Sequence, residues 1–121
     1  AQRGYAEAQY GLGFGYKIGR GVKQDFKKAA KWHRKAAIQG QAFSQAQLGV
    51  MYSNGKGVSK SLSTAYAWFH IAAINGYRNT RKSKGIITKQ MTGDQIYAGL
   101  ELSKELLKQI NANRLEKELK K

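Results

Sequence analysis

The pattern of small and apolar residues predicts two helix pairs that repeat every 36 residues. In the first helix of each pair, such residues recur at i, i+4 and i+8 and form one face: Ala8, Leu12 and Tyr16, then Ser44, Leu48 and Tyr52. In the second helix, the corresponding face comprises Phe26, Ala29, Trp32/His33 and Ala36, then Leu62, Ala65, Trp68/Phe69 and Ala72. A period of this length indicates a stacked array, in which each unit buries its apolar face against its neighbours.

Glycines and short polar residues mark the ends of the predicted helices. A Gly-x-Gly-Val segment follows each first helix, at residues 19–22 and 55–58. Glycine past a helix end supplies the left-handed cap and lets the chain reverse. The second helices are predicted to begin at the caps Asp25 and Ser61 and to end at Gly40 and Gly76. Gly13 and Gly49 lie in mid-helix, where glycine costs about 1 kcal/mol relative to alanine, and so indicate close backbone approach between the helices of a pair.

These residues carry a family resemblance. The pattern Ala-x-Ala-Gln-x-x-Leu-Gly-x-x-Tyr-x-x-Gly-x-Gly-Val, then Asp-x-x-x-Ala-x-x-Trp-x-x-x-Ala-Ala-x-x-Gly, resembles the Sel1-like repeat, a relative of the tetratricopeptide repeat. The second unit departs from the usual Ala and Asp at Ser44 and Ser61. The resemblance implies an all-α fold, an α-solenoid of helix–turn–helix repeats forming a right-handed superhelix. The repeats are expected at residues 5–40 and 41–76.

Both ends of the chain differ from a complete repeat. Residues 1–4 align with residues 37–40 and 73–76, so we expect the chain to begin inside the last turn of a preceding repeat. A mature N-terminus left by signal-peptide cleavage is the alternative. An array cut at this point exposes an apolar edge that favours self-association. The residues of that edge are Tyr5, Tyr10 and Phe14.

Residues 77–121 lose the repeat consensus and predict a C-terminal helical cap, which solenoids need for solubility. Residues 78–89 correspond to a third first helix. Thr92 and Gln95 fit a capping box that opens a last helix. The apolar stripe of that helix is Ile96, Leu100, Leu107 and Ile110. Lys28, Lys31 and Lys35 of the first unit correspond to Thr64, Ala67 and Ile71 of the second, which predicts that the cap buries this neutral face.

The amino-acid composition and charge exclude several classes of function. The chain has no cysteine, which excludes disulfides, thiolate catalysis and zinc–thiolate sites, and it has no apolar run long enough to span a bilayer. Its net charge is +15, from 22 Lys and Arg against 7 Asp and Glu. No acidic residue lies between Asp25 and Asp94, whereas twelve basic residues do: Lys27, Lys28, Lys31, Arg34, Lys35, Lys56, Lys60, Arg78, Arg81, Lys82, Lys84 and Lys89. Such a field attracts acidic partners.

The sequence offers no chemistry that points to catalysis. The Gly-x-Gly segments follow helices and lack the Gly-Lys-Ser/Thr of a phosphate-binding loop. His33 and His70 are one residue out of phase in different repeats, which makes them a poor metal pair and favours packing or surface roles. No carboxylate pair or Ser/His/Asp set has supporting spacing. We therefore predict no enzymatic activity, metal or cofactor, with an envelope hydrolase as the alternative.

Two surfaces are candidate binding sites. The first is the basic patch of the second helix, formed by Lys27, Lys28, Lys31, Arg34 and Lys35. The second lies on the first helices, which line the concave side of such arrays, at positions that vary between the units. Its proposed partner-binding residues are Glu7, Phe14, Lys17, Gln47, Val50 and Asn54, near Gly11, Phe43 and Ser53. Ordinary solvent exposure is the alternative for both surfaces.

The resemblance implies a non-catalytic protein–protein interaction module of the adaptor, regulator or toxin-neutralising type. Because the net charge is strongly positive, we expect the partner protein to be acidic and to bind through the concave face and the basic patch. A nucleic-acid-binding protein is one alternative, disfavoured because the aromatic residues occupy framework positions. A fragment with only structural or self-association behaviour is another. The compartment stays open, with the bacterial periplasm or secretion favoured over the cytoplasm.

Overall fold

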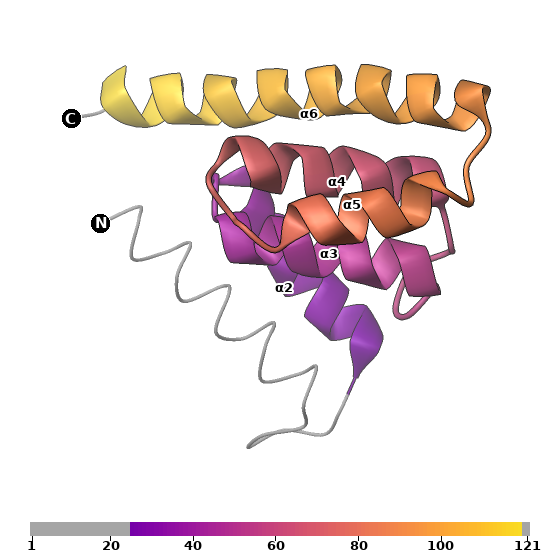
Figure 1. The fold of residues 1–121 in the computed structure, drawn as a ribbon. Coiled ribbons are helices and arrows are strands. Elements are labelled where there is room, and N and C mark those ends of the chain that lie inside the picture. Colours follow the sequence, from indigo (N-terminus) through magenta and orange to yellow (C-terminus); the bar gives the residue numbers. More distant parts are fainter. Residues whose placement is uncertain (1–24, 120–121) are drawn as a thin grey trace.

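The computed structural model describes residues 25–119, which form five helices and no strand (Figure 1). The helices are α2 (Phe26–Ile38), α3 (Ala42–Asn54), α4 (Leu62–Ile74), α5 (Thr80–Thr88) and α6 (Gly93–Leu119). The predicted all-α repeat fold is confirmed in this part of the chain. Several residues named above lie outside the described residues: residues 1–4, Tyr5, Glu7, Tyr10, Gly11, Gly13, Phe14, Lys17, Gly19 and Gly21.

The helix ends form as the sequence predicts. The side chains of Asp25 and Ser61 cap α2 and α4, each accepting a hydrogen bond of 3.2 Å from the backbone N–H three residues later. Gly55 ends α3 in the left-handed conformation with φ 67°. Gly57 also has a positive φ of 78°, and a Cβ there would overlap the carbonyl oxygen of Phe26. This turn therefore needs glycine both for its backbone conformation and to pack against the start of α2.

The mid-helix Gly49 allows α4 to pack closely on α3. A Cβ at Gly49 would lie 2.6 Å from the ring of Phe69 on α4, well inside van der Waals contact. Phe69 is buried with Ala65, Tyr66 and Ile87 in one apolar cluster. The two helices do approach closely at Gly49, but the atoms nearest to it belong to an aromatic side chain, whereas the sequence predicted close approach of the backbone.

The last helix, α6, lies along α4 and continues past its end (Figure 1). Leu106 and Ile110 of α6 pack in one buried cluster with Ala67, Trp68 and Ile71 of α4. Ala67 and Ile71 are fully buried, which confirms that the cap covers the neutral face of the second unit.

The start of α6 is a complete capping box. The backbone N–H of Gln95 donates to Thr92 Oγ1 at 3.1 Å, and the N–H of Thr92 donates to Gln95 Oε1 at 2.9 Å. The four residues of the predicted stripe all pack against the core, but only Ile110 among them is buried, and the other buried positions of the described α6 side chains are Gly99, Ser103 and Leu106. A Cβ at Gly99 would lie 2.9 Å from the Ser63 carbonyl oxygen, so a small residue is required where the two helices are closest.

The helix α5 lies where the first helix of a third repeat would be. It begins two residues later and ends one residue earlier than the predicted segment 78–89. It packs on α4, where Ile87 joins the cluster around Phe69, and it scarcely contacts α6. The α5–α6 pair therefore does not repeat the packing of the α3–α4 pair.

Candidate functional site

The basic patch of α2 is a solvent-facing set of cations. Its five members are exposed: Lys27, Lys28, Lys31, Arg34 and Lys35. Two of them lie over aromatic rings, because the Arg34 guanidinium carbon is 6.0 Å from the Trp68 ring centroid and Lys35 Nζ is 4.4 Å from that of Trp32. Such contacts hold a cation near the protein surface without neutralising its charge. The patch can therefore attract an anion.

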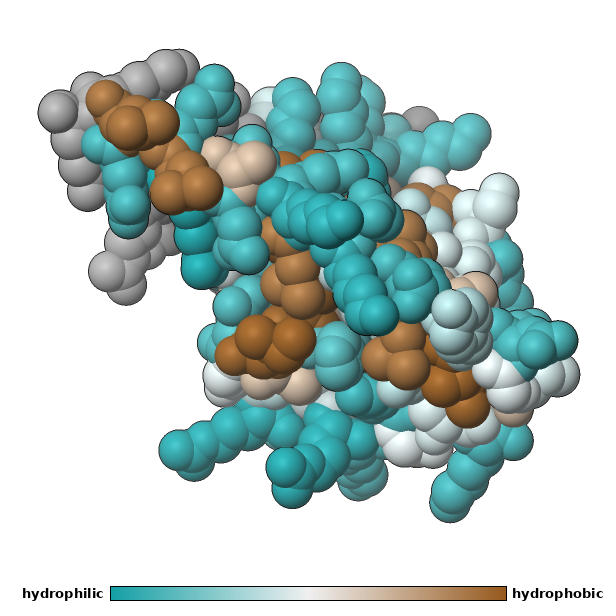
Figure 2. Space-filling model, turned by 90° about the horizontal axis from the view of Figure 1, so that it is seen from above, coloured by the Kyte–Doolittle hydropathy of each residue, from teal (hydrophilic) through white to brown (hydrophobic). Residues whose placement is uncertain are grey.

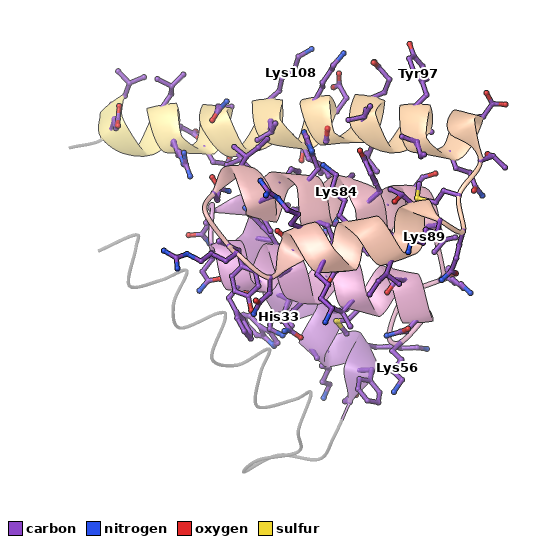
Figure 3. The ribbon with its side chains drawn as sticks, in the orientation of Figure 1. His33, Lys56, Lys84, Lys89, Tyr97 and Lys108 are labelled. Atoms are coloured by element: carbon purple, nitrogen blue, oxygen red, sulfur yellow. The ribbon has the colours of Figure 1, made fainter. Side chains whose placement is uncertain are left out.

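Acidic residues are segregated from this patch. In the described part of the chain, five of the six acidic residues lie on α6, and Asp25 is the sixth. Two ion pairs also lie on α6, joining Lys104 to Glu101 at 3.1 Å and Lys108 to Glu105 at 3.4 Å. Figure 3 shows Tyr97 and Lys108 pointing away from the other helices on the outer side of α6. The positive potential is therefore concentrated on α2 to α5, where no acidic residue follows Asp25.

The face of the molecule seen from above in Figure 2 is largely hydrophilic, with separate hydrophobic patches. Large exposed apolar residues on α6 are Tyr97, Leu115 and Leu119. None of the described helices has the length and hydropathy needed to cross a membrane.

The predicted recognition residues on α3 differ in their exposure. Gln47 is half-buried, and Asn54 is exposed at the last position of α3. Val50 is half-buried and packs against the apolar cluster around Phe69, so it contributes to the core as well as to the surface. Phe43 stands edge-on to Tyr77, with ring centroids 5.8 Å apart. The other predicted partner-binding residues, Glu7, Phe14 and Lys17, lie outside the described residues.

The sequence reasoning did not assign the cations of α5 to a site, although it counted them. Arg78, Arg81, Lys82 and Lys89 are exposed and form no ion pair with any described residue. Ile86 lies among them and is 53% exposed. The signal that could have found them is the repeat phase, because residues 81, 82 and 85 correspond to the framework positions 45, 46 and 49.

A titratable cluster lies between α4 and α5. Lys84 Nζ donates to His70 Nδ1 at 2.9 Å and lies 5.0 Å from the Tyr66 ring centroid, while the rings of Tyr66 and His70 are stacked. Burial, and after it the neighbouring Lys84 ammonium, lower the pKa of His70 below 6.5. Burial also lowers the pKa of Lys84 from its usual 10.5. The neutral imidazole thus accepts from the lysine and helps attach α5 to α4.

The other histidine has a packing role. His33 is fully buried, and its Nδ1 forms a hydrogen bond of 3.1 Å with Ser44 Oγ. This contact explains why the second unit has serine at position 44, where the repeat usually has alanine. Among the residues that the structure describes, no three His, Asp or Glu side chains come together as metal ligands.

Comparison with known families decides the classification. A model of the Sel1 repeat matches residues 6–41 and 42–77, more than half of the chain. The chain belongs to the Sel1 repeat family. Proteins of this family are typically protein–protein interaction modules and generally non-catalytic scaffolds.

Solved structures of Sel1 repeat proteins have the same fold. The chain is similar to a protective antigen of uropathogenic Escherichia coli strains that displays an SLR fold, with a TM-score of 0.83 and 34% identity over 93% of this chain and 25% of that one. It is also similar to a Sel1 repeat protein from Oxalobacter formigenes, with a TM-score of 0.65 and 36% identity over 66% of this chain and 60% of that one. The chain thus spans about a quarter of the first structure and less than two thirds of the second. Among curated proteins there is no match.

Proposed function

We propose that this Sel1 repeat chain is a non-catalytic module that binds an acidic partner protein, using the first-helix surface around Gln47, Val50 and Asn54 together with the basic patch of α2. The observation that carries the proposal is the segregation of charge. The helices α2 to α5 present many exposed cations and no acidic residue after the Asp25 cap, whereas acidic residues lie on α6. The Sel1 repeat family supplies the binding role, and the charge supplies the chemistry of the partner.

The mechanism combines steering and shape. Exposed cations raise the rate of encounter with an acidic surface, and this effect weakens as salt is added. The contacts between helices, such as Gly49 with Phe69, keep the binding surface in one geometry. Rim cations of this kind change association rate and specificity more than the affinity of the final complex.

The test begins with a pull-down from the native organism, with the chain as bait and the triple variant Lys27→Glu, Lys31→Glu, Arg34→Glu beside it. A second variant, Lys104→Glu with Lys108→Glu, reverses cations that already have partners on α6. Each captured protein is then purified, and its affinity is measured at low and at physiological salt.

We expect the α2 variant to lose an acidic partner that the α6 variant retains, and the affinity for that partner to fall at higher salt. Retention of every partner by the α2 variant removes the basic patch from the proposal. A tight, salt-resistant complex with RNA or DNA instead of a protein would favour the nucleic-acid alternative. Concentration-dependent size with no captured protein would indicate self-association.

A further inference from the structure

The face of α5 that corresponds to the helix-pairing face of α3 is open to solvent. Gln45, Ala46 and Gly49 of α3 are buried where α3 is packed between α2 and α4. Their counterparts 36 residues later are Arg81, Lys82 and Gly85, which are all exposed. The difference arises because α6 lies along α4 and leaves α5 without a paired helix.

Gly49 and Gly85 occupy the same repeat position, but only Gly49 has a side chain packed against it. At Gly49 a Cβ would lie 2.6 Å from the ring of Phe69, which belongs to the paired helix. At Gly85 a Cβ would have no atom within 4 Å. The notch that accepts an aromatic ring in α3 is therefore retained in α5 but is not filled by any described residue.

The chemistry around this notch is specific. Arg81, Gly85 and Lys89 follow one another at i, i+4 and i+8 and so lie on one side of α5, with Lys82 and Ile86 beside them. Ile86 is more than half exposed, and the three cations have no ion pair within the described residues. An apolar centre between unneutralised cations is complementary to an apolar side chain between carboxylates.

We propose that this face of α5, formed by Arg81, Lys82, Gly85, Ile86 and Lys89 and called the α5 face below, binds an acidic helix of a partner protein. The partner's helix takes the position on α5 that α4 takes on α3. It places a large apolar side chain against Gly85 and Ile86, and carboxylates one turn away on either side meet Arg81 or Lys82 and Lys89. The inference rests on the proposed function and names the structural element that the partner contributes.

The probe for the test is a synthetic 14-residue helical peptide with one central phenylalanine and glutamates three and four residues before it and four residues after it. Its affinity for the full chain is measured by fluorescence anisotropy, and amide chemical shifts locate the peptide. Two altered peptides serve as controls: one has alanine in place of phenylalanine, and the other has glutamine in place of each glutamate.

Three protein variants separate this site from the α2 patch. The α5 variant is Arg81→Glu, Lys82→Glu, Lys89→Glu. The matched α2 variant is Lys27→Glu, Lys31→Glu, Lys35→Glu, which changes the net charge by the same amount. Gly85→Phe fills the notch without changing charge, and the open space around Gly85 accepts the new side chain. Circular dichroism checks that each variant keeps its helix content.

We expect the α5 variant and Gly85→Phe each to weaken binding at least about tenfold, because the charge reversals replace several attractive pairs with repulsive ones, while the phenylalanine blocks the notch. The α2 variant should weaken binding less than threefold, and both altered peptides should bind worse than the probe.

Other results overturn the inference. Loss of binding in the α2 variant with retention in the α5 variant refutes the α5 face but leaves the acidic partner of the proposed function standing. No binding by the wild-type chain at low salt refutes the α5 face, whereas the native-partner experiment judges the proposed function separately. A single-stranded RNA that competes with the peptide and is unaffected by Gly85→Phe would show an unspecific polyanion surface.

Discussion

The buried side chain of Gln45 ties two consecutive repeats together, and replacing it tests how the array holds its shape. Gln45 is fully buried at the start of α3. Its Nε2 donates to the carbonyl oxygen of Ala37 at 3.0 Å, and its Oε1 accepts from Asn75 Nδ2 at 2.8 Å. One amide therefore connects the end of α2 with the end of α4.

The expected cost of Gln45→Leu follows from these two bonds. A hydrogen bond within a protein contributes a net 0.5–1.5 kcal/mol, so losing both should destabilise the fold by about 1–3 kcal/mol. The destabilisation should stay below the upper end of this range, because the Ala37 carbonyl oxygen keeps a second hydrogen bond, from Gly40 N–H at 3.0 Å. Leucine has a similar volume, which keeps the cavity term small. Because repeat stability depends on contacts between neighbours, α2 should separate from α3 before the rest unfolds.

Urea unfolding followed by circular dichroism measures the free energy, and amide hydrogen exchange shows where protection is lost. Asn75→Ala is the matched control, since it removes only the half-buried partner and should cost less than Gln45→Leu. The double variant should cost less than the sum of the two single ones. A stability of Gln45→Leu within about 0.3 kcal/mol of wild type, with unchanged exchange in α2, would refute the role of this side chain.

Four further outcomes are expected. Gly49→Ala should destabilise the fold by about 1–3 kcal/mol in urea unfolding, because its methyl group overlaps the ring of Phe69. Gly85→Ala on the open face should instead stabilise the fold by up to about 1 kcal/mol. Equal effects of the two variants would contradict the difference in packing. Since the pKa of His70 is lowered in the folded state, the unfolded chain binds the extra proton, so the contribution of His70 to stability should be complete above pH 6.5 and decline as the pH falls below it. Lys84→Met should raise the pKa of His70 in an NMR titration, and an unchanged value would show that the ammonium has no effect. Thr92→Ala should cost about 1 kcal/mol in thermal unfolding by removing the cap of α6.

Most of the fold could be predicted from the repeat period, because the residues that recur with it set the local backbone conformation of turns and helix ends. Positive φ angles at Gly55 and Gly57 and side-chain caps at Asp25 and Ser61 depend on residues within four positions of each other. The burial of Ala67 and Ile71 could also be predicted, because an interior position cannot keep the lysines found in the first unit.

The remaining features depend on contacts between distant residues, which one sequence does not reveal. Gln9 and Gln45 recur in phase, but only the structure shows that Gln45 joins the ends of α2 and α4. The half-burial of Val50 arises from the cluster around Phe69, so a varying position is not necessarily a free one. For the candidate sites, the sequence located the cations of α2, but the exposure of the α5 face depends on where α6 packs.

Small residues on α6 explain why the α5 face is open. Gly99 lets α6 approach α4 so closely that a Cβ would lie 2.9 Å from both the Ser63 carbonyl oxygen and the Tyr66 ring. A helix held in this position closes the array over α4, and the same helix cannot also lie along α5 as α4 lies along α3. The cations of α5 then avoid the cost of burial, because no helix of the described chain covers them. The contact that ends the solenoid on one side thus leaves a charged, unpaired helix on the other.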